Sequence, residues 1–71
     1  MQVDYTQHSR DQMTVRHISR TEVEETLSRP YHTVTSRVSG NTIYFGRPGG
    51  RSIAVVVVPG SSPPRIVTVW D

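Results

Sequence analysis

Histidines and arginines are the residues of this 71-residue chain whose side chains could do chemistry. Cleavage of RNA without a metal ion needs a base at the 2′-hydroxyl and an acid at the leaving 5′-oxygen. It also needs cations at the phosphate, whose charge grows in the transition state. Imidazole and guanidinium groups supply all three, and the chain offers His8, His17 and His32 together with eight arginines. The chain therefore contains the residue types that such a reaction would require.

Two sets of residues in the second half of the sequence could contact nucleic acid. Arg37 and Tyr44 fall on the outward face of two adjacent strands if the hairpin register holds. An aromatic ring beside a guanidinium group is a stacking platform for bases. Arg47 and Arg51 flank a Pro-Gly-Gly turn and would form a mobile cationic tip. We predict nucleic-acid contacts for these four residues, although solvent-facing strands and basic turns commonly have the same composition.

The sequence lacks the residue spacing of a metal site, a phosphate-binding loop or a Ser/His/Asp triad. No two histidines have the i, i+4 spacing of a helical metal site, and no carboxylate is close in sequence to His32. The Gly46–Gly50 segment lies between predicted strands and lacks the lysine and the following helix of a phosphate-binding loop. There is no nucleophile elbow for Ser/His/Asp catalysis. We therefore expect neither a metal site nor a cofactor.

The charge of the chain is divided unevenly. Residues 1–28 hold three arginines and five carboxylates, whereas residues 29–70 hold five arginines and no carboxylate. An uncompensated cationic segment favours polyanions or an acidic protein partner. The absence of lysine has a second explanation in an arginine-biased codon pool, so it carries little functional weight.

Length and composition restrict the fold. With 71 residues and no cysteine, the chain has room for one domain with a thin core and no disulfides. We see no basic-then-apolar leader, and the longest apolar run, Ile53 to Val58, is too short to cross a bilayer. We expect a single cytoplasmic domain over residues 1–71, with a helical part at 5–28, a sheet part at 31–70 and no membrane contact.

The first part of the chain predicts two helices. Ser19 and Glu22 have the spacing of a capping box, so a helix should start there. It should run to about Ser28, because Pro30 disfavours helical geometry at the residue before it. Upstream, residues Thr6 or Asp4 could cap a first helix through about Arg16.

After Pro30 the apolar pattern changes to the period of two residues that is typical of strands. Strands are predicted over residues 31–38, 41–47, 53–58 and 65–70, separated by segments rich in Gly, Pro, Ser and Asn. In the second strand, Ile43 and Phe45 should point inward, and Thr42 and Tyr44 outward. The predicted fold is α+β, with two N-terminal helices packed on one face of a four-stranded antiparallel meander sheet.

Two short helices can cover only one face of such a sheet. The other face should carry some of Ala54, Val56, Val58, Val67 and Val69 and be partly exposed in a monomer. Because exposed apolar patches usually mark interfaces, a second copy or a partner protein would cover this face. The alternative is a curled sheet that closes over its own valines.

The sequence also resembles a known family. The residues that carry the resemblance are Thr-Gln-His-Ser at 6–9, Met13, Arg-His-Ile-Ser at 16–19, Val-Glu-Glu at 23–25, Ile-Tyr-Phe-Gly at 43–46 and the valines of 55–58 and 67–69. They resemble an uncharacterised bacterial family, the domain of unknown function numbered 4258, over nearly the whole chain. Two positions depart from its pattern, since Ser9 replaces the usual Ala and Gln12 replaces the usual Arg.

That family is similar to small toxins of the RelE and BrnT type, in which helices precede an antiparallel sheet that docks on RNA. The resemblance implies a metal-independent ribonuclease of a toxin–antitoxin pair, with an antitoxin-like protein as partner. It makes His8 the first candidate for the general base or acid, and Arg16 the candidate phosphate ligand. His8 could instead have only a structural role, and Arg16 could form an ion pair with Asp11, Glu22 or Glu25. The protein as a whole could be a non-catalytic binding module or a structural homodimer.

Overall fold

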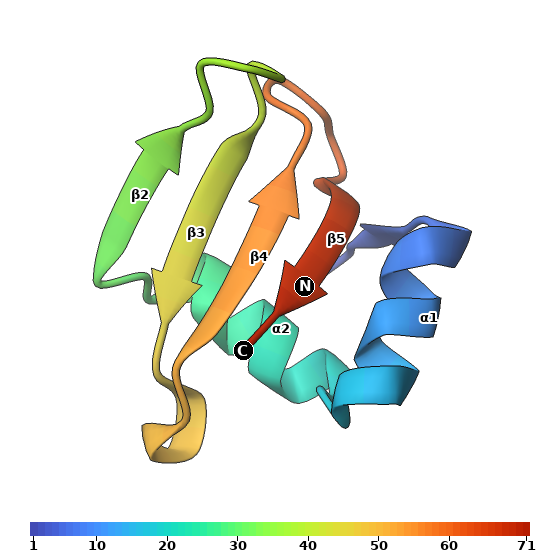
Figure 1. Cartoon of the computed structure of the whole chain (residues 1–71), viewed down its shortest axis with the longest axis vertical. Coiled ribbons are helices and arrows are strands. Elements are labelled where there is room, and N and C mark those ends of the chain that lie inside the picture. Colours follow the sequence, from blue (N-terminus) through green and yellow to red (C-terminus); the bar gives the residue numbers. More distant parts are fainter.

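The computed structural model describes all 71 residues and consists of two helices packed on a five-stranded sheet (Figure 1). The elements in chain order are β1 (Asp4–Tyr5), α1 (Gln7–Arg16), α2 (Arg20–Ser28), β2 (His32–Thr35), β3 (Thr42–Gly46), the 3-10 helix η1 (Pro48–Gly50), β4 (Ile53–Val57) and β5 (Arg65–Trp70). The α+β class is confirmed. Neither helix has the length and hydropathy that crossing a bilayer requires.

The sheet differs from the predicted meander by one strand. Its order is β1-β5-β4-β3-β2, and β2 to β5 form the expected antiparallel meander. The additional strand, β1, pairs in parallel with β5, with Asp4 opposite Arg65 and Tyr5 opposite Ile66. The prediction of a four-stranded, purely antiparallel sheet was therefore wrong. A strand of two residues is too short for any alternation to show in the sequence.

The first helix is held against the exposed edge of β5. Thr6 is its N-cap, because the Thr6 hydroxyl oxygen accepts a hydrogen bond from the Ser9 amide. The same hydroxyl donates to the Ile66 carbonyl at 2.7 Å, which fixes the start of α1 beside β5. The helix ends at Arg16, and His17 follows in the left-handed conformation, with φ 55°. The chain can therefore turn sharply into α2, which lies behind β3 and β4 (Figure 1).

The second helix begins with the predicted capping box. The Glu22 amide donates to the Ser19 hydroxyl at 3.1 Å, and the Ser19 amide donates to the Glu22 carboxylate at 2.9 Å. The helix ends at Ser28, as predicted. It packs closely on β3, because a Cβ placed on Gly46 would lie 3.0 Å from the backbone and side chain of Thr26.

The core lies between the helices and one face of the sheet. Its buried residues are Tyr5, Ile18, Val23, Ile53, Val55, Val57, Ile66 and Val69. Tyr44 is opposite Val55 in the register and packs against this core, so Tyr44 and Thr42 face the helices. The predicted facing of β3 was therefore reversed. The alternation of β3 does not show which of its faces meets the helices. The neighbouring β4 gives no help, because it is apolar and buried on both faces.

The opposite face of the sheet, here called the open face, is covered by no helix. The pairing places on it His32, Val34, Ile43, Phe45, Ala54, Val56, Thr68 and Trp70. Ala54 and Val56 are nevertheless only 2% and 7% exposed, because side chains of the adjacent strands cover them, and Val69 belongs to the core. Of the valines expected to be exposed, Val58 and Val67 are partly exposed. On the open face itself His32 and Val34 are exposed, and Phe45 and Trp70 are half-buried.

Candidate nucleic-acid interface

Three aromatic side chains, here called the aromatic row, cross one end of the open face. His32 and Phe45 are opposite each other in β2 and β3, and their rings stack with centroids 6.1 Å apart. Phe45 also meets Trp70 edge to face, with centroids 6.4 Å apart. These two residues lie on either side of Ala54 in β4, whose small side chain leaves room for the rings to meet above it.

Tyr31 lies just before β2 and extends the aromatic row. Its side chain is 58% exposed, and its ring lies 6.4 Å from that of Phe45. Tyr31 lines two pockets. One, of about 230 Å³, is formed with Phe45, Ala54 and Trp70. The other, of about 590 Å³, is formed with Arg29 and Arg47. One tyrosine thus separates an aromatic pocket from a cationic one.

The two arginines of the cationic pocket are not neutralised by carboxylates. The ion pairs of the strand-rich half are made by Arg51 and Arg65 instead. The guanidinium carbon of Arg47 lies 5.2 Å from the centroid of the Tyr31 ring, in a cation–π arrangement. Glu25 is the one carboxylate in the pocket wall, so the pocket keeps a net positive charge. It can receive a phosphate group.

Arg51, predicted to belong to a mobile cationic tip, is instead held by the protein. Its guanidinium donates to the carbonyls of Arg16 and His17 at 2.5 and 2.8 Å, and to the Asp71 carboxylate at 2.6 Å. The hydrogen bond from Arg51, assisted by Arg16, lowers the pKa of Asp71 below its ordinary value. The same bond raises the pKa of Arg51. Arg51 therefore has a structural role at the junction of the two helices.

Arg37 and Tyr44 do not share a surface. The strand β2 ends at Thr35, so Arg37 lies in the exposed turn before β3 rather than on a strand. Tyr44 points into the helix-covered face, as described above. The prediction that Arg37 and Tyr44 lie side by side was wrong, because the first strand was predicted to run to residue 38 and β2 ends three residues earlier, at Thr35. Of the four predicted contacts, only Arg47 lies beside an exposed aromatic ring without an ion pair, and its guanidinium also donates to the Ser52 hydroxyl at 3.3 Å.

His8 and Arg16, the two residues singled out by the family resemblance, are both exposed on α1 but do not meet. They are eight residues apart on one helix, which separates them by about 12 Å along its axis. The imidazole of His8 lies 3.1 Å from the hydroxyl of Thr68, at the edge of the open face. Arg16 donates hydrogen bonds to Gln12 and to Asp71 and forms an ion pair with Asp71. It forms none with Asp11, Glu22 or Glu25, the partners considered from the sequence.

Most residues of the aromatic row and the cationic pocket were not predicted from the sequence. Tyr31, Phe45 and Trp70 are far apart in sequence, and only the strand register brings them together. A usable signal was the single alanine, Ala54, within a run of valines, since a small residue there makes room for large neighbours. No three His, Asp or Glu side chains come together as ligands for a metal ion.

Comparison with known proteins places the chain in a family. A family model described as a domain of unknown function, DUF4258, matches residues 5–71. The chain therefore belongs to the DUF4258 family. No curated protein and no solved structure matches it. The matched segment includes every helix and all of the residues that form the aromatic row and the cationic pocket.

Proposed function

We propose that this member of the DUF4258 family binds single-stranded RNA at the aromatic row and the adjoining cationic pocket. One observation carries the proposal: the exposed ring of Tyr31 is the wall between a pocket of aromatic side chains and a pocket with two arginines. A nucleotide has the same two parts, a base that stacks and a phosphate that attracts guanidinium groups. The base would lie on Phe45 and Trp70, and the phosphate beside Arg29 and Arg47.

The form of the surface favours a single strand over a duplex. Aromatic rings on a sheet can stack only on bases that are already unstacked and turned outward. Stacking on a protein aromatic ring contributes about 1–3 kcal/mol per base and depends little on base identity. The proposed binding is therefore sequence-tolerant, and the arginines contribute a part that salt weakens.

Fluorescence anisotropy titrations test this function. The probes are a labelled single-stranded RNA, a DNA strand of the same sequence and an RNA duplex, each at 50 and 200 mM salt. We expect the single-stranded RNA to bind more tightly than the duplex, with a log K against log salt slope of about −1.4 for two phosphate contacts. Absence of binding, binding independent of salt, or preference for the duplex or the DNA strand would each contradict the proposal. Sedimentation of the same samples shows whether a second copy occupies the open face instead.

Cleavage of the bound RNA is a second candidate function, and it rests on His8. This imidazole is exposed and lies beside Thr68 on the open face, where a bound strand could reach it. General acid–base cleavage needs a second group close by. Arg16 is about 12 Å away along α1, and His32 lies three strands away, about 14 Å. An antitoxin-like partner would be expected only if cleavage occurs.

A further inference from the structure

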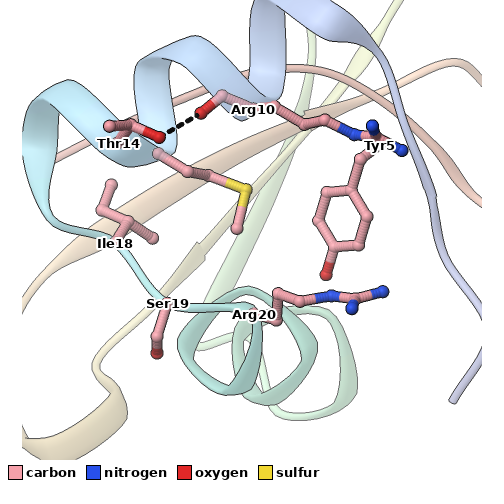
Figure 2. Close-up of a pocket in the computed structure, with 7 residues that line it drawn as sticks. Tyr5, Arg10, Thr14, Ile18, Ser19 and Arg20 are labelled. Carbon is pink, nitrogen blue, oxygen red and sulfur yellow. Dashed lines mark hydrogen bonds between the residues drawn. The ribbon is translucent and has the colours of Figure 1, made fainter.

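A third pocket lies at the other end of the sheet, between β1, α1 and the start of α2 (Figure 2). Its volume is about 500 Å³, within the range that holds small molecules. It is far in the sheet order from Tyr31, since β1 and β2 are the two edge strands. Its residues take no part in the RNA interface.

The hydroxyl of Tyr5 is the least explained polar group in the molecule. Tyr5 is only 9% exposed, its hydroxyl oxygen is buried, and no hydrogen bond of good geometry reaches it, although the Arg20 guanidinium lies close enough to act on it. Burial raises the pKa of this phenol, and the neighbouring Arg20 acts in the opposite direction. Buried polar groups nearly always have a partner, so an unpaired one calls for an explanation. A ligand in the pocket that Tyr5 lines would supply the missing partner.

Two guanidinium groups line the same pocket. Arg10 comes from α1 and Arg20 from the first turn of α2, and in Figure 2 the Tyr5 ring lies between them with its hydroxyl directed toward Arg20. The guanidinium carbon of Arg20 lies 5.2 Å from the ring centroid. Neither arginine forms an ion pair. Glu24 is the carboxylate that acts on Tyr5, but it pairs with the amino group of Met1 and does not line the pocket.

The remaining walls suit an organic group. Met13 and Ile18 supply apolar surface, and Figure 2 shows Ile18 on the side of the pocket away from Arg10 and Arg20. Ser19, the N-cap of α2, also lines the pocket, and its amide and hydroxyl are hydrogen-bonded to Glu22 in the capping box. Charged donors, a phenol and an apolar wall converge on one volume.

We propose that this pocket binds a phosphate monoester with an organic part of about the size of a nucleoside. Its phosphate oxygens accept hydrogen bonds from Arg10, Arg20 and the Tyr5 hydroxyl, while the organic part packs on Met13 and Ile18. Three donors from separate elements suit the several oxygens of a phosphate better than a single carboxylate. The phosphate belongs either to a free nucleotide or to the end of an RNA strand.

Isothermal titration calorimetry with adenosine monophosphate, inorganic phosphate and adenosine tests the site on the intact protein. We expect the monophosphate to bind more tightly than either of its parts. Tyr5→Phe should weaken binding about tenfold or more, since a hydrogen bond to a charged group is lost. The same substitution should leave the Tm of the unliganded protein unchanged or raised, because it removes a buried hydroxyl that has no partner. Arg37→Gln, which removes a distant exposed charge, should bind like the wild type.

The site would be overturned if the folded wild type did not bind the monophosphate, if adenosine bound equally well, or if Tyr5→Phe had unchanged affinity. Equal binding of inorganic phosphate would also overturn it, as the organic part would then contribute nothing. An RNA trinucleotide with a 5′-phosphate, compared with its 5′-hydroxyl form in wild type and Tyr5→Phe, distinguishes an RNA end from a free nucleotide. Phe45→Leu should not affect binding of the monophosphate. A failure of the phosphate site can therefore be distinguished from a failure of the proposed RNA interface.

Discussion

The guanidinium of Arg51 donates a hydrogen bond to the carboxylate of Asp71 at 2.6 Å, and so joins the segment after η1 to the end of β5. The same guanidinium donates to the carbonyls of Arg16 and His17, at the end of α1. The last carbonyls of a helix have no partner within the helix, so a cation placed there is stabilising. One arginine thus holds three separate parts of the chain together.

Arg51→Gln should lower the Tm by several degrees, because it removes the charge and the forked donor that reaches three acceptors at once. Arg51→Lys keeps the charge without the fork and should have an intermediate Tm. Thermal unfolding followed by circular dichroism measures the series. Arg37→Gln is the matched control, since it removes an exposed arginine with no partner. Equal Tm values for Arg51→Gln and Arg37→Gln would show that the hydrogen bonds contribute no stability.

Asp71 should make the stability depend on acid. The hydrogen bond from Arg51 lowers its pKa in the folded state, so the folded protein keeps this carboxylate ionised at a pH where the unfolded chain takes up a proton. The stabilisation is therefore present above about pH 4 and is lost as the pH falls through the lowered pKa. Asp71→Asn should be less stable than the wild type at pH 7, and the difference should shrink toward pH 3. Urea unfolding at both pH values measures it, and a constant difference would contradict the assignment.

Gly46 allows α2 to approach the sheet. A Cβ at this position would lie 3.0 Å from Thr26, including its backbone, so Gly46→Ala must push the helix away. We expect a loss of about 1–3 kcal/mol in the free energy of unfolding. Adding Thr26→Ala removes the side-chain part of the clash and should recover some of the loss relative to Thr26→Ala alone. Denaturant unfolding of the wild type, both single variants and the double variant measures the coupling free energy between the two substitutions. If their effects on the free energy of unfolding simply add, the contact between Gly46 and Thr26 does not cause the loss.

RNA binding should separate into a stacking part and a charge part. Phe45→Leu keeps an apolar side chain on the open face but removes the ring, and should weaken binding roughly five- to 150-fold, or about 1–3 kcal/mol. Arg47→Gln should reduce the salt slope by about 0.7, since one phosphate contact is lost. Arg37→Gln has the same change of charge at the far turn and should leave the slope unchanged. If Arg37→Gln and Arg47→Gln behave alike, binding depends on overall charge and not on this pocket.

Local signals in the sequence predicted local structure well. The capping box at Ser19 and Glu22 lies within four residues, and both ends of α2 were predicted correctly. The facing of β3 was not predictable, because the two-sided apolar β4 is compatible with either orientation. The parallel pairing of β1 depends on residues about 60 positions away in the chain, which no local pattern reports.

The candidate site depends still more on long-range contacts. Arg47 and Arg51 have similar positions around one turn, yet one lies over an exposed tyrosine and the other is bonded to the helix junction. Residue type alone cannot distinguish them, because the difference comes from how α1 ends beside η1. The aromatic row likewise follows from the register of four strands.

The position of His8 leads to the last prediction, that the protein binds RNA without cutting it. His8 lies beside Thr68 at the edge of the open face, whereas Arg16 is hydrogen-bonded to Gln12 and Asp71 about 12 Å along α1, and His32 lies three strands away. Total RNA incubated with the purified protein and a metal chelator should therefore remain intact on a gel. His8→Asn, which keeps a polar group beside Thr68, should bind RNA like the wild type. Cleavage that the wild type performs and His8→Asn does not would contradict this expectation and establish a ribonuclease, and Arg16→Gln would then show whether the arginine takes part.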